Sequence, residues 1–336
     1  MRSLLRLALV NALPPALFDE RADLGTVRRL FATYVKLVEI ENHGYCNRTC
    51  WFCPNTFLDR RSGLSPMPGR VFEKILSGLA DVGYDETLVW ARYHEPLAHE
   101  SIFENVARAR AALPRAFLTM HSNGDYLTGE MVDRLERAGL DQLRLNLYVP
   151  NDRTFSAELE AEMLAQLCRR TGLAVERGSS GTRRLGGRRL DMPVHVPDFR
   201  RGMSTRGGLL GVSGGDGYVR TSACLSPVQH VVIDHDGKGV LCCQVRSDAP
   251  EHAGAVIGDL TAGGYGIFDL YRDLADARAG LVNGGPKSGV CRTCAVNLGG
   301  PDRFGRAAVV GAALSAVGAS AIAGRMWKAR ARRYEP

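Results

Sequence analysis

Lysine is scarce in this chain, and the sequence lacks the pattern that usually accompanies nucleic-acid binding. Only five of the 43 basic residues are lysines, and no basic patch is interleaved with aromatic residues. Proteins that bind single-stranded nucleic acid combine such aromatics with a positively charged groove. The net charge of +7 is better explained by the codon bias of a GC-rich genome, and four of those charges fall in the last twelve residues. We therefore expect no nucleic-acid partner.

The chain also lacks an internal repeat and a clear secretion signal. Residues 1–16 place Arg2 and Arg6 before an apolar run, but the run is short and no clear small-residue cleavage site follows it. A signal peptide is the alternative to our interpretation of an N-terminal helix. We assign this helix to a helical extension over residues 1–33.

One long uncharged run is present, from Ala307 to Gly324, and a basic tail follows it. Its length approaches that of a membrane span, but its content of Ala and Gly makes it a weak candidate. If this run crossed the membrane with its basic tail in the cytoplasm, the rest of the chain would lie on the other side of the membrane. We instead predict a helix, within residues 301–336, that packs on the fold or contacts the surface of an anionic membrane from the cytoplasmic side.

The middle of the chain alternates segments typical of strands and helices. Its 336 residues, 45% of them hydrophobic and 24% charged, suit one large globular domain or two modest ones. The expected strands cover 34–40, 87–90, 117–121, 143–148 and 191–196. One expected helix begins at residue 67, and three others cover 99–112, 129–138 and 157–170. This order predicts an α/β fold with parallel strands and crossover helices over residues 34–210. A Gly/Arg-rich loop, 179–189, interrupts the rhythm and is expected to be mobile.

A different pattern begins at about residue 211. Asp236-Gly237 separates two apolar runs within 231–241, which is a strong signal of a β-hairpin. A helical stretch around Phe268 to Leu274 follows. We therefore predict a second, smaller unit over residues 211–300.

Three of the nine cysteines, Cys46, Cys50 and Cys53, form the motif C-x3-C-x2-C directly after the first expected strand. Closely spaced thiolates hold iron–sulfur clusters, and three of them leave one iron of a [4Fe–4S] cluster open to a small ligand. A structural zinc site is the alternative, but zinc sites usually pair two C-x2-C halves or use histidines. Here only His43 is near in sequence.

The motif, with an aromatic residue before its last cysteine, resembles the signature of the radical S-adenosylmethionine (SAM) superfamily. The resemblance covers most of the chain. It implies a partial (β/α)6 TIM-type barrel, a [4Fe–4S] cluster held by Cys46, Cys50 and Cys53, and SAM bound at the open iron. It also implies a reductant of the flavodoxin or ferredoxin type.

A second set of cysteines, Cys224, Cys242, Cys291 and Cys294, follows the barrel region. The arrangement resembles the C-terminal extension called SPASM, and especially its shorter form, the twitch domain, as in members similar to 2-deoxy-scyllo-inosamine dehydrogenase. The resemblance implies a small β-hairpin/α extension with one auxiliary [4Fe–4S] cluster. Four thiolates would also suit structural zinc. Cys243, next to Cys242, is an alternative ligand.

Glu95 is the first candidate for binding SAM. The run Tyr93-His94-Glu95-Pro96 follows the second expected strand, where the superfamily carries a Gly-Gly-Glu motif that binds the SAM amino group. The glutamate is kept and both glycines are replaced, which leaves the backbone path open. A carboxylate is the group that an ammonium ion requires. A solvated loop carboxylate is the alternative.

Four further residues match positions that contact SAM in the superfamily. Ser122 and Asn123 precede Gly124 as in a common Thr-Asn-Gly, although an Asn-Gly turn alone is routine. Asn146 is a polar residue inside an apolar strand, where it needs a partner unless it faces outward. Phe52 matches the aromatic whose backbone lies near adenine.

The resemblance implies that the 5′-deoxyadenosyl radical abstracts hydrogen from a small-molecule or carbohydrate substrate. We expect the oxidation of an alcohol carbon, with the auxiliary cluster as electron acceptor. Epimerisation is a related alternative, in which the thiol of Cys243 returns a hydrogen atom; the other free thiol, Cys168, has the pattern of a buried core residue. His195, Arg200, Arg201 and Arg206 could face an anionic or sugar-like substrate, or form a solvated basic loop.

Two other classes of function stay open. One is a radical SAM peptide or protein maturase, although the 33 residues before the first strand are too few for a winged-helix leader-binding module. The other is a metal-binding interaction protein without catalysis. Seven cysteines in cluster-type spacings require a reducing compartment, so we expect a cytoplasmic protein, peripheral to the inner membrane face if the tail binds there.

Overall fold

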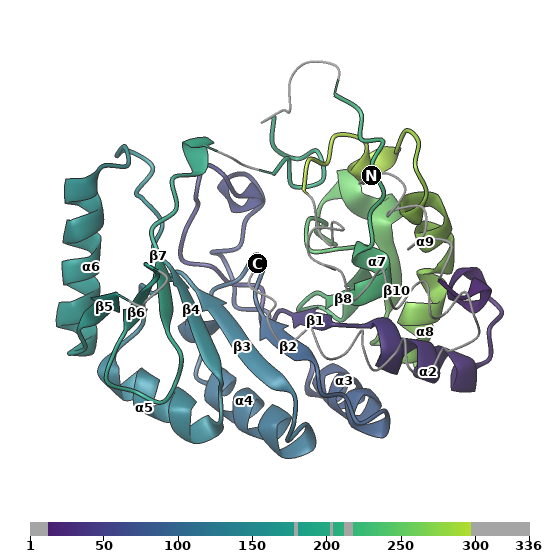
Figure 1. The fold of residues 1–336 in the computed structure, drawn as a ribbon, viewed down its shortest axis with the longest axis horizontal. Helices are drawn as coiled ribbons and strands as arrows, with labels where there is room; N and C mark the ends of the chain where they lie inside the picture. The colour runs from purple at the N-terminus through teal and green to yellow at the C-terminus, as the bar shows by residue number, and fades with distance from the viewer. Residues whose placement is uncertain (1–12, 178–180, 202–203, 212–217, 297–336) are drawn as a thin grey trace.

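The computed structural model describes residues 13–177, 181–201, 204–211 and 218–296, and it contains one ten-stranded sheet (Figure 1). The strands are β1 (Leu37–Ile40), β2 (Thr87–Trp90), β3 (Phe117–Ser122), β4 (Gln142–Asn146), β5 (Val175–Arg177), β6 (Arg183–Leu185), β7 (Pro193–His195), β8 (His230–Ile233), β9 (Lys238–Val240) and β10 (Val256–Asp259). Their order across the sheet is β10-β9-β8-β1-β2-β3-β4-β7-β6-β5.

Helices connect most of these strands. The α-helices are α2 (Leu24–Tyr34), α3 (Gly69–Asp81), α4 (Ser101–Ala112), α5 (Gly129–Ala138), α6 (Ala157–Thr171), α7 (Ser226–Gln229), α8 (Ile267–Asp273) and α9 (Ala275–Val282). Short 3-10 helices are η1 (Pro15–Phe18), η2 (Pro54–Thr56), η3 (Pro96–Ala98), η4 (Phe199–Arg201), η5 (Pro250–Ala255) and η6 (Gly289–Cys291). Local signals set several bounds: the Thr128 side chain accepts from Met131 N at the start of α5, and Gly139 ends that helix with φ of 91°.

The α/β prediction is confirmed, because the six strands β8-β1-β2-β3-β4-β7 are mutually parallel. Helices α3, α4 and α5 are the crossovers between successive strands from β1 to β4, and they lie on one face of the sheet (Figure 1). The sheet does not close, since β10 and β5 are its two edges. The sixth parallel strand, β8, pairs with β1 and comes from the region after residue 211. The predicted division of domains stays a prediction.

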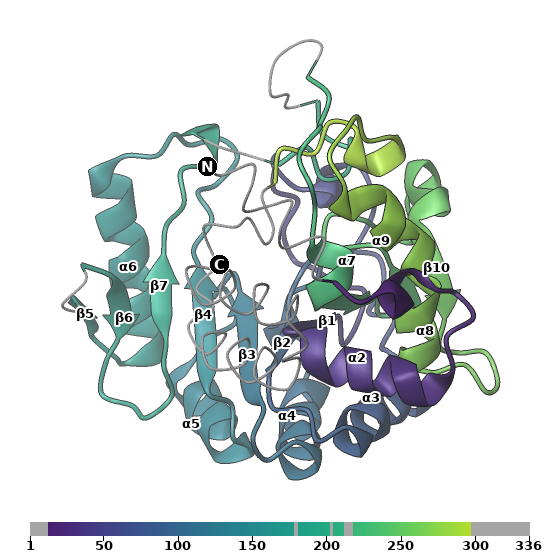
Figure 2. The same cartoon turned by 45° about the vertical axis from the view of Figure 1, so that its right-hand side comes forward.

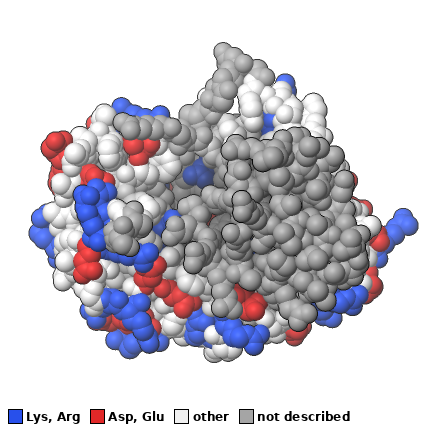
Figure 3. All heavy atoms as spheres, viewed as in Figure 1, with Lys and Arg blue, Asp and Glu red and all other residues white. Residues whose placement is uncertain are grey.

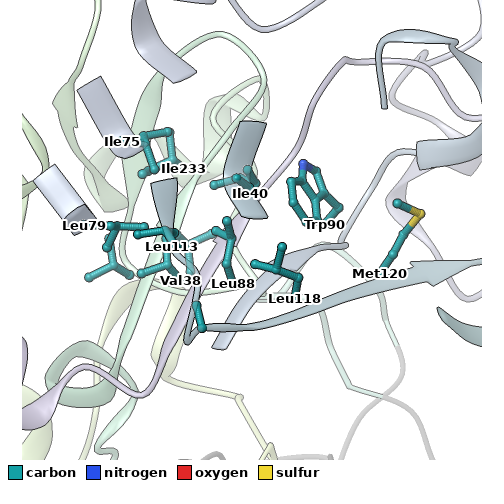
Figure 4. Packing of buried hydrophobic residues seen from close by; sticks show 14 of the residues in the cluster. Val38, Ile40, Ile75, Leu79, Leu88, Trp90, Leu113, Leu118, Met120 and Ile233 are labelled. Atoms are coloured by element: carbon teal, nitrogen blue, oxygen red, sulfur yellow. The ribbon is translucent and has the colours of Figure 1, made fainter. Parts of the chain in front are cut away.

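The two faces of the parallel strands differ in chemistry. Side chains alternate between faces along a strand, and one set, which includes Val38, Ile40, Leu88 and Trp90, is fully buried. Figure 4 shows this set packed with Ile75 of α3. The opposite face is polar and carries the carboxylates and imidazoles described below. Most of the hydrophobic core therefore lies between the sheet and α3–α5. The opposite face of the sheet carries the polar side chains that could bind ligands.

Two expectations about strands were wrong. The first strand does not begin at Tyr34, because α2 extends through Tyr34 and β1 begins only at Leu37; Val27 and Phe31, four residues apart, are the buried face of that helix. The 179–189 segment is not a plain loop, since β6 lies inside it and pairs antiparallel with β5 and β7 (Figure 2). Cross-strand pairing, which sequence spacing does not reveal, overrode the Gly/Arg composition.

The hairpin signal at Asp236-Gly237 is confirmed. Strands β8 and β9 pair antiparallel, and Gly237 adopts φ of 87°, a conformation that suits glycine. Beyond β10, helix α8 packs against α2, where Phe31 lies 5.3 Å from the ring of Phe268. This contact joins the segment before β1 to the segment after β8.

On the surface seen in Figure 3, basic and acidic side chains are interspersed over the described residues. Along the described chain, the computed structure contains no helix that is long and apolar enough to cross a membrane. The run Ala307 to Gly324 and the basic tail lie outside the described residues, as does most of the predicted helix over 1–16.

Candidate active site and metal centres

The three cysteines of the C-x3-C-x2-C motif line one cavity at the carboxyl ends of the parallel strands. Cys46, Cys50 and Cys53 lie on the loop that follows β1, and none is in a disulfide. Because Ser122 and Asn146 at the ends of β3 and β4 line the same cavity, the loop projects its thiols over the edge of the sheet where parallel α/β folds gather reactive groups.

An ion pair holds this loop in place. The Arg48 guanidinium donates two hydrogen bonds of 2.6 Å to the two carboxylate oxygens of Asp125, and a third of 2.8 Å to the carbonyl of Tyr148. Asp125 lies just after β3, and Tyr148 just after β4. Bidentate pairs of this kind fix geometry as well as charge. The triad loop is therefore positioned by two neighbouring strand ends.

The chemistry of the triad fits a bound metal cluster. Burial raises the pKa of the Cys46 and Cys50 thiols to about 12, so without metal both thiols in this cavity are neutral. Metal binding displaces such protons. His43, the histidine that zinc would recruit by sequence proximity, does not line the cavity, and its Nδ1 accepts from the Tyr45 amide. The zinc alternative thus has no fourth ligand at His43.

Glu95, Ser122 and Asn123 are brought together at one wall of the cavity. The Glu95 carboxylate is 1% exposed and accepts from Ser122 Oγ at 2.7 Å, from Asn123 N at 2.7 Å and from Leu97 N at 3.1 Å. Burial raises its pKa to about 7, although these hydrogen bonds lower it. A carboxylate accepts about four hydrogen bonds. One acceptor position therefore remains for a ligand.

Aromatic rings form a shelf beside the triad. Phe52 is 5% exposed, stacks on Phe199 with centroids 3.9 Å apart, and lies 5.1 Å from the ring of Tyr148. Phe52, Tyr148 and Asn146 all line the cavity. A flat apolar surface next to a polar amide is suited to a planar base such as adenine.

Several cavity residues had not been singled out from the sequence. Glu39 and Arg92 line the cavity, and His230 lies beside Glu39, with its Nε2 2.9 Å from Glu39 Oε2. Glu39 carried the same signal that identified Asn146, a polar residue within an apolar strand. His230 precedes the predicted hairpin and carried no such signal. Its place next to Glu39 depends on the pairing of β8 with β1.

The basic residues after the fifth strand separate in the structure. Arg206 lines the cavity and has a left-handed φ of 48°, a conformation that is unusual outside glycine. Arg200 lies instead in a neighbouring hollow with Trp51, and His195 ends β7, paired in register with Asn146. The side chain of Arg201 is outside the described residues.

The second cysteine set lines a separate cavity. Cys224 precedes α7, Cys242 follows β9, and Cys291 and Cys294 lie at and after η6. The other walls are largely apolar, with Pro227, Leu241 and Leu281 among them. Four thiols that line one largely apolar pocket match the donor set of either a [4Fe–4S] cluster or structural zinc.

A buried cation accompanies these four thiols. Arg220 is 2% exposed, donates to the carbonyl of Val296 at 2.6 Å, and places Nη1 3.6 Å from Cys294 Sγ. Among the described residues it has no carboxylate partner within ion-pair distance. The carbonyls of Ser222, Ala223 and Cys294 also accept from it, so its donors are satisfied, while a nearby anion would offset its charge. Metal-bound thiolates would provide that charge, whereas neutral thiols would not.

Cys242 and Cys243 point into different cavities. Cys242 lines the four-cysteine pocket, and Cys243 lines the cavity of the triad. The two cavities thus adjoin at one peptide bond. Cys168 lies on α6 and lines neither of them.

Comparisons with known proteins find related sequences and a shared fold. The family model of the radical SAM superfamily matches residues 43–177. The S-adenosyl-L-methionine-dependent 2-deoxy-scyllo-inosamine dehydrogenase of Niallia circulans is 27% identical over 106 residues, which is 32% of this chain and 42% of that protein. The match therefore spans less than half of the relative's length.

Two solved structures share the fold. BtrN in complex with AdoMet and 2-DOIA gives a TM-score of 0.57 at 20% identity, covering 78% of this chain and 94% of BtrN. Selenomethionine BtrN in an open conformation gives 0.52 at 18% identity, covering 78% and 92%. At these identities the likeness establishes the architecture alone.

Proposed function

Because the chain carries a radical SAM domain across residues 43–177, we propose that it is an oxidoreductase that uses SAM to oxidise an alcohol carbon of a small molecule or carbohydrate. Such a domain uses one [4Fe–4S] cluster and SAM. When bound, they supply a 5′-deoxyadenosyl radical that removes a hydrogen atom from an unactivated carbon. The protein's task is to bind, orient and shield the reactants.

Each predicted site residue has a defined place in this proposal. Cys46, Cys50 and Cys53 would hold the cluster, since they converge in one cavity on a loop fixed by Arg48. Glu95 would accept a hydrogen bond from the SAM amino group, with Ser122 and Asn123 orienting its carboxylate.

Two residues at the aromatic end of the cavity complete the SAM site. Phe52 belongs to the aromatic shelf and would lie against adenine. Asn146, at the end of β4, would bond the ribose or the carboxylate of SAM. Both residues face the space that a ligand at the triad would reach.

We further propose that Cys224, Cys242, Cys291 and Cys294 hold an auxiliary [4Fe–4S] cluster that accepts one electron during turnover. Oxidation of an alcohol to a ketone removes a hydrogen atom, an electron and a proton. The radical takes the hydrogen atom, so the other two need separate acceptors within the protein. The Arg220 guanidinium beside Cys294 favours an anionic metal–thiolate centre at this position.

The observation that carries the proposal is the adjacency of Cys242 and Cys243, which face the two cavities from consecutive positions. An electron that leaves a substrate radical in the triad cavity therefore has a short path to the four-cysteine pocket. The name of the Niallia circulans relative suggests the first substrate to test, 2-deoxy-scyllo-inosamine.

Epimerisation is the second candidate, because Cys243 lines the triad cavity. A thiol there is placed to return a hydrogen atom to a substrate radical. Turnover in deuterated water separates the two reactions. An epimerase incorporates solvent deuterium at carbon and loses it in the Cys243→Ser variant, whereas a dehydrogenase gives a ketone without such deuterium.

We also propose a cytoplasmic location and an electron donor of the flavodoxin or ferredoxin type, since seven thiolate ligands need a reducing compartment. Contact of the C-terminal tail with a membrane surface stays a prediction from the sequence, since the tail lies outside the described residues.

The test is anaerobic reconstitution of the full chain with iron and sulfide, followed by dithionite and SAM. We expect about eight irons per chain and the formation of 5′-deoxyadenosine. Cys50→Ser should abolish SAM cleavage, while Cys168→Ser, outside both cavities, should leave it unchanged. Bound zinc in place of iron, or no 5′-deoxyadenosine, would contradict the assignment.

A further inference from the structure

Glu39, His230 and Cys243 form a compact group on the polar face of the sheet that neither cysteine set accounts for. Their carboxylate oxygen, ring nitrogen and sulfur all lie within 4.8 Å of one another. Glu39 and His230 are each 7% exposed, and they lie on the same face because Leu37, two residues before Glu39, pairs in register with His230. The three side chains come from β1, β8 and the segment after β9.

Glu39 and His230 form a buried contact at a short distance. His230 Nε2 is buried and, among the described residues, makes no hydrogen bond of normal geometry, although Glu39 Oε2 is only 2.9 Å away. Buried polar groups normally have well-aligned partners, and the Glu39 carboxylate is close to this nitrogen but poorly aligned with it. A cation bound between the nitrogen and the oxygen would satisfy both.

The donor set matches one metal in particular. Carboxylate oxygen, imidazole nitrogen and thiolate sulfur all bind zinc at about 2.0–2.3 Å, so tetrahedral ligand atoms lie roughly 3.4 Å apart. The three donors lie within 4.8 Å of one another, with His230 Nε2 2.9 Å from Glu39 Oε2, and ligation would draw them to this spacing. A zinc ion with one carboxylate and one thiolate is electrically neutral, which suits a buried position. The nearby guanidinium of Arg92 is already paired with Asp234.

We propose that Glu39, His230 and Cys243 bind a zinc ion, a metal centre distinct from both cysteine sets. A zinc-bound Cys243 thiolate has no hydrogen atom to return, so this site would exclude the epimerase candidate. Three protein ligands leave the fourth zinc position open, as in catalytic zinc sites. Glu39 and Cys243 line the triad cavity, so the open position faces the space where the substrate would lie. A substrate hydroxyl or amino group fits there, and zinc would polarise it. Only this last role rests on the proposed function; the metal site itself does not.

The test uses the full chain with its iron and sulfide reconstituted anaerobically. One equivalent of zinc chloride is added, loose metal is removed on a desalting column, and metals are quantified. We expect one retained zinc per chain, and zinc-edge X-ray absorption showing a single sulfur ligand with nitrogen and oxygen for the rest. Glu39→Gln, His230→Gln and Cys243→Ser should each weaken retention at least about tenfold, with iron unchanged.

Controls distinguish zinc at this site from zinc bound by the two cysteine sets. Cys168→Ser removes a thiol outside both cavities and should keep the zinc. If His230→Gln fails to fold by circular dichroism, the milder Cys243→Ser still decides. Absence of retained zinc, zinc with four sulfur ligands, or equal retention in the variants would overturn the site. Formation of 5′-deoxyadenosine is measured in parallel, so its failure counts against the proposed function and zinc loss against this site.

Discussion

Replacing Glu95 by glutamine should weaken SAM binding strongly if the proposed function is right, because the proposal makes this buried carboxylate the acceptor for the SAM ammonium group. Glu95 is 1% exposed, and three hydrogen bonds hold it from Ser122, Asn123 and Leu97. Truncating one partner of a buried, hydrogen-bonded charge pair costs about 2–5 kcal/mol. At roughly 1.4 kcal/mol per tenfold, the dissociation constant should rise about 30-fold or more.

The same interaction should depend on pH in a defined direction. Burial raises the pKa of Glu95 to about 7, so below that pH the SAM-free protein carries it protonated. The SAM amino group stays an ammonium ion below about pH 7.7. Binding must then ionise Glu95, and the dissociation constant should rise about fivefold from pH 7 to pH 6, because half of the protein already carries a protonated Glu95 at pH 7. Burial lowers the pKa of His43 and of His121 to about 4, so neither changes charge in this range.

The assay is calorimetric titration of SAM into the anaerobic, cluster-loaded protein at pH 6.0, 6.5 and 7.0. Glu95→Gln should bind weakly and without pH dependence over this range. Glu100→Gln is the matched control, since Glu100 is a surface carboxylate paired with Arg134. A Glu95→Gln protein that binds SAM within about threefold of the native chain, or a native dissociation constant that is flat across the range, would refute the reasoning.

Three further outcomes can be checked on purified protein. Gly239→Ala should destabilise the fold by about 1–3 kcal/mol in denaturant unfolding, because the added methyl would collide with the Leu270 side chain; an unchanged midpoint contradicts the packing. Asp125→Asn should lower the iron content by up to about four atoms per chain, since it breaks the bidentate pair with Arg48 that fixes the triad loop. Arg220→Gln should lower the reduction potential of the auxiliary centre by tens of millivolts, because the reduced cluster loses the stabilisation of a positive charge; a tenfold change in the equilibrium constant of a one-electron couple is ~59 mV. Spectroelectrochemistry that detects no decrease would argue against the guanidinium as the counter-charge of this centre.

The local elements were largely readable from the chain because their signals are local. Hydrophobic spacing located α3, and Gly129–Ala138 was expected at the bounds that the structure gives. The turn at Gly237 followed from the dipeptide alone. Errors arose where a partner strand or the packing of a helix decided the outcome, as at β6 and at Tyr34.

The sequence by itself determined the chemistry of this protein, and the tertiary structure decided which groups share a cavity. The spacing of Cys46, Cys50 and Cys53 is a local property, so it indicated a cluster site before any fold was known. That Cys242 and Cys243 face opposite cavities depends on how β9 ends. The meeting of Glu39 with His230 depends on β8 pairing with β1 across nearly 200 residues. Contacts between segments so far apart are set by sheet register and packing, which composition and motif spacing do not encode.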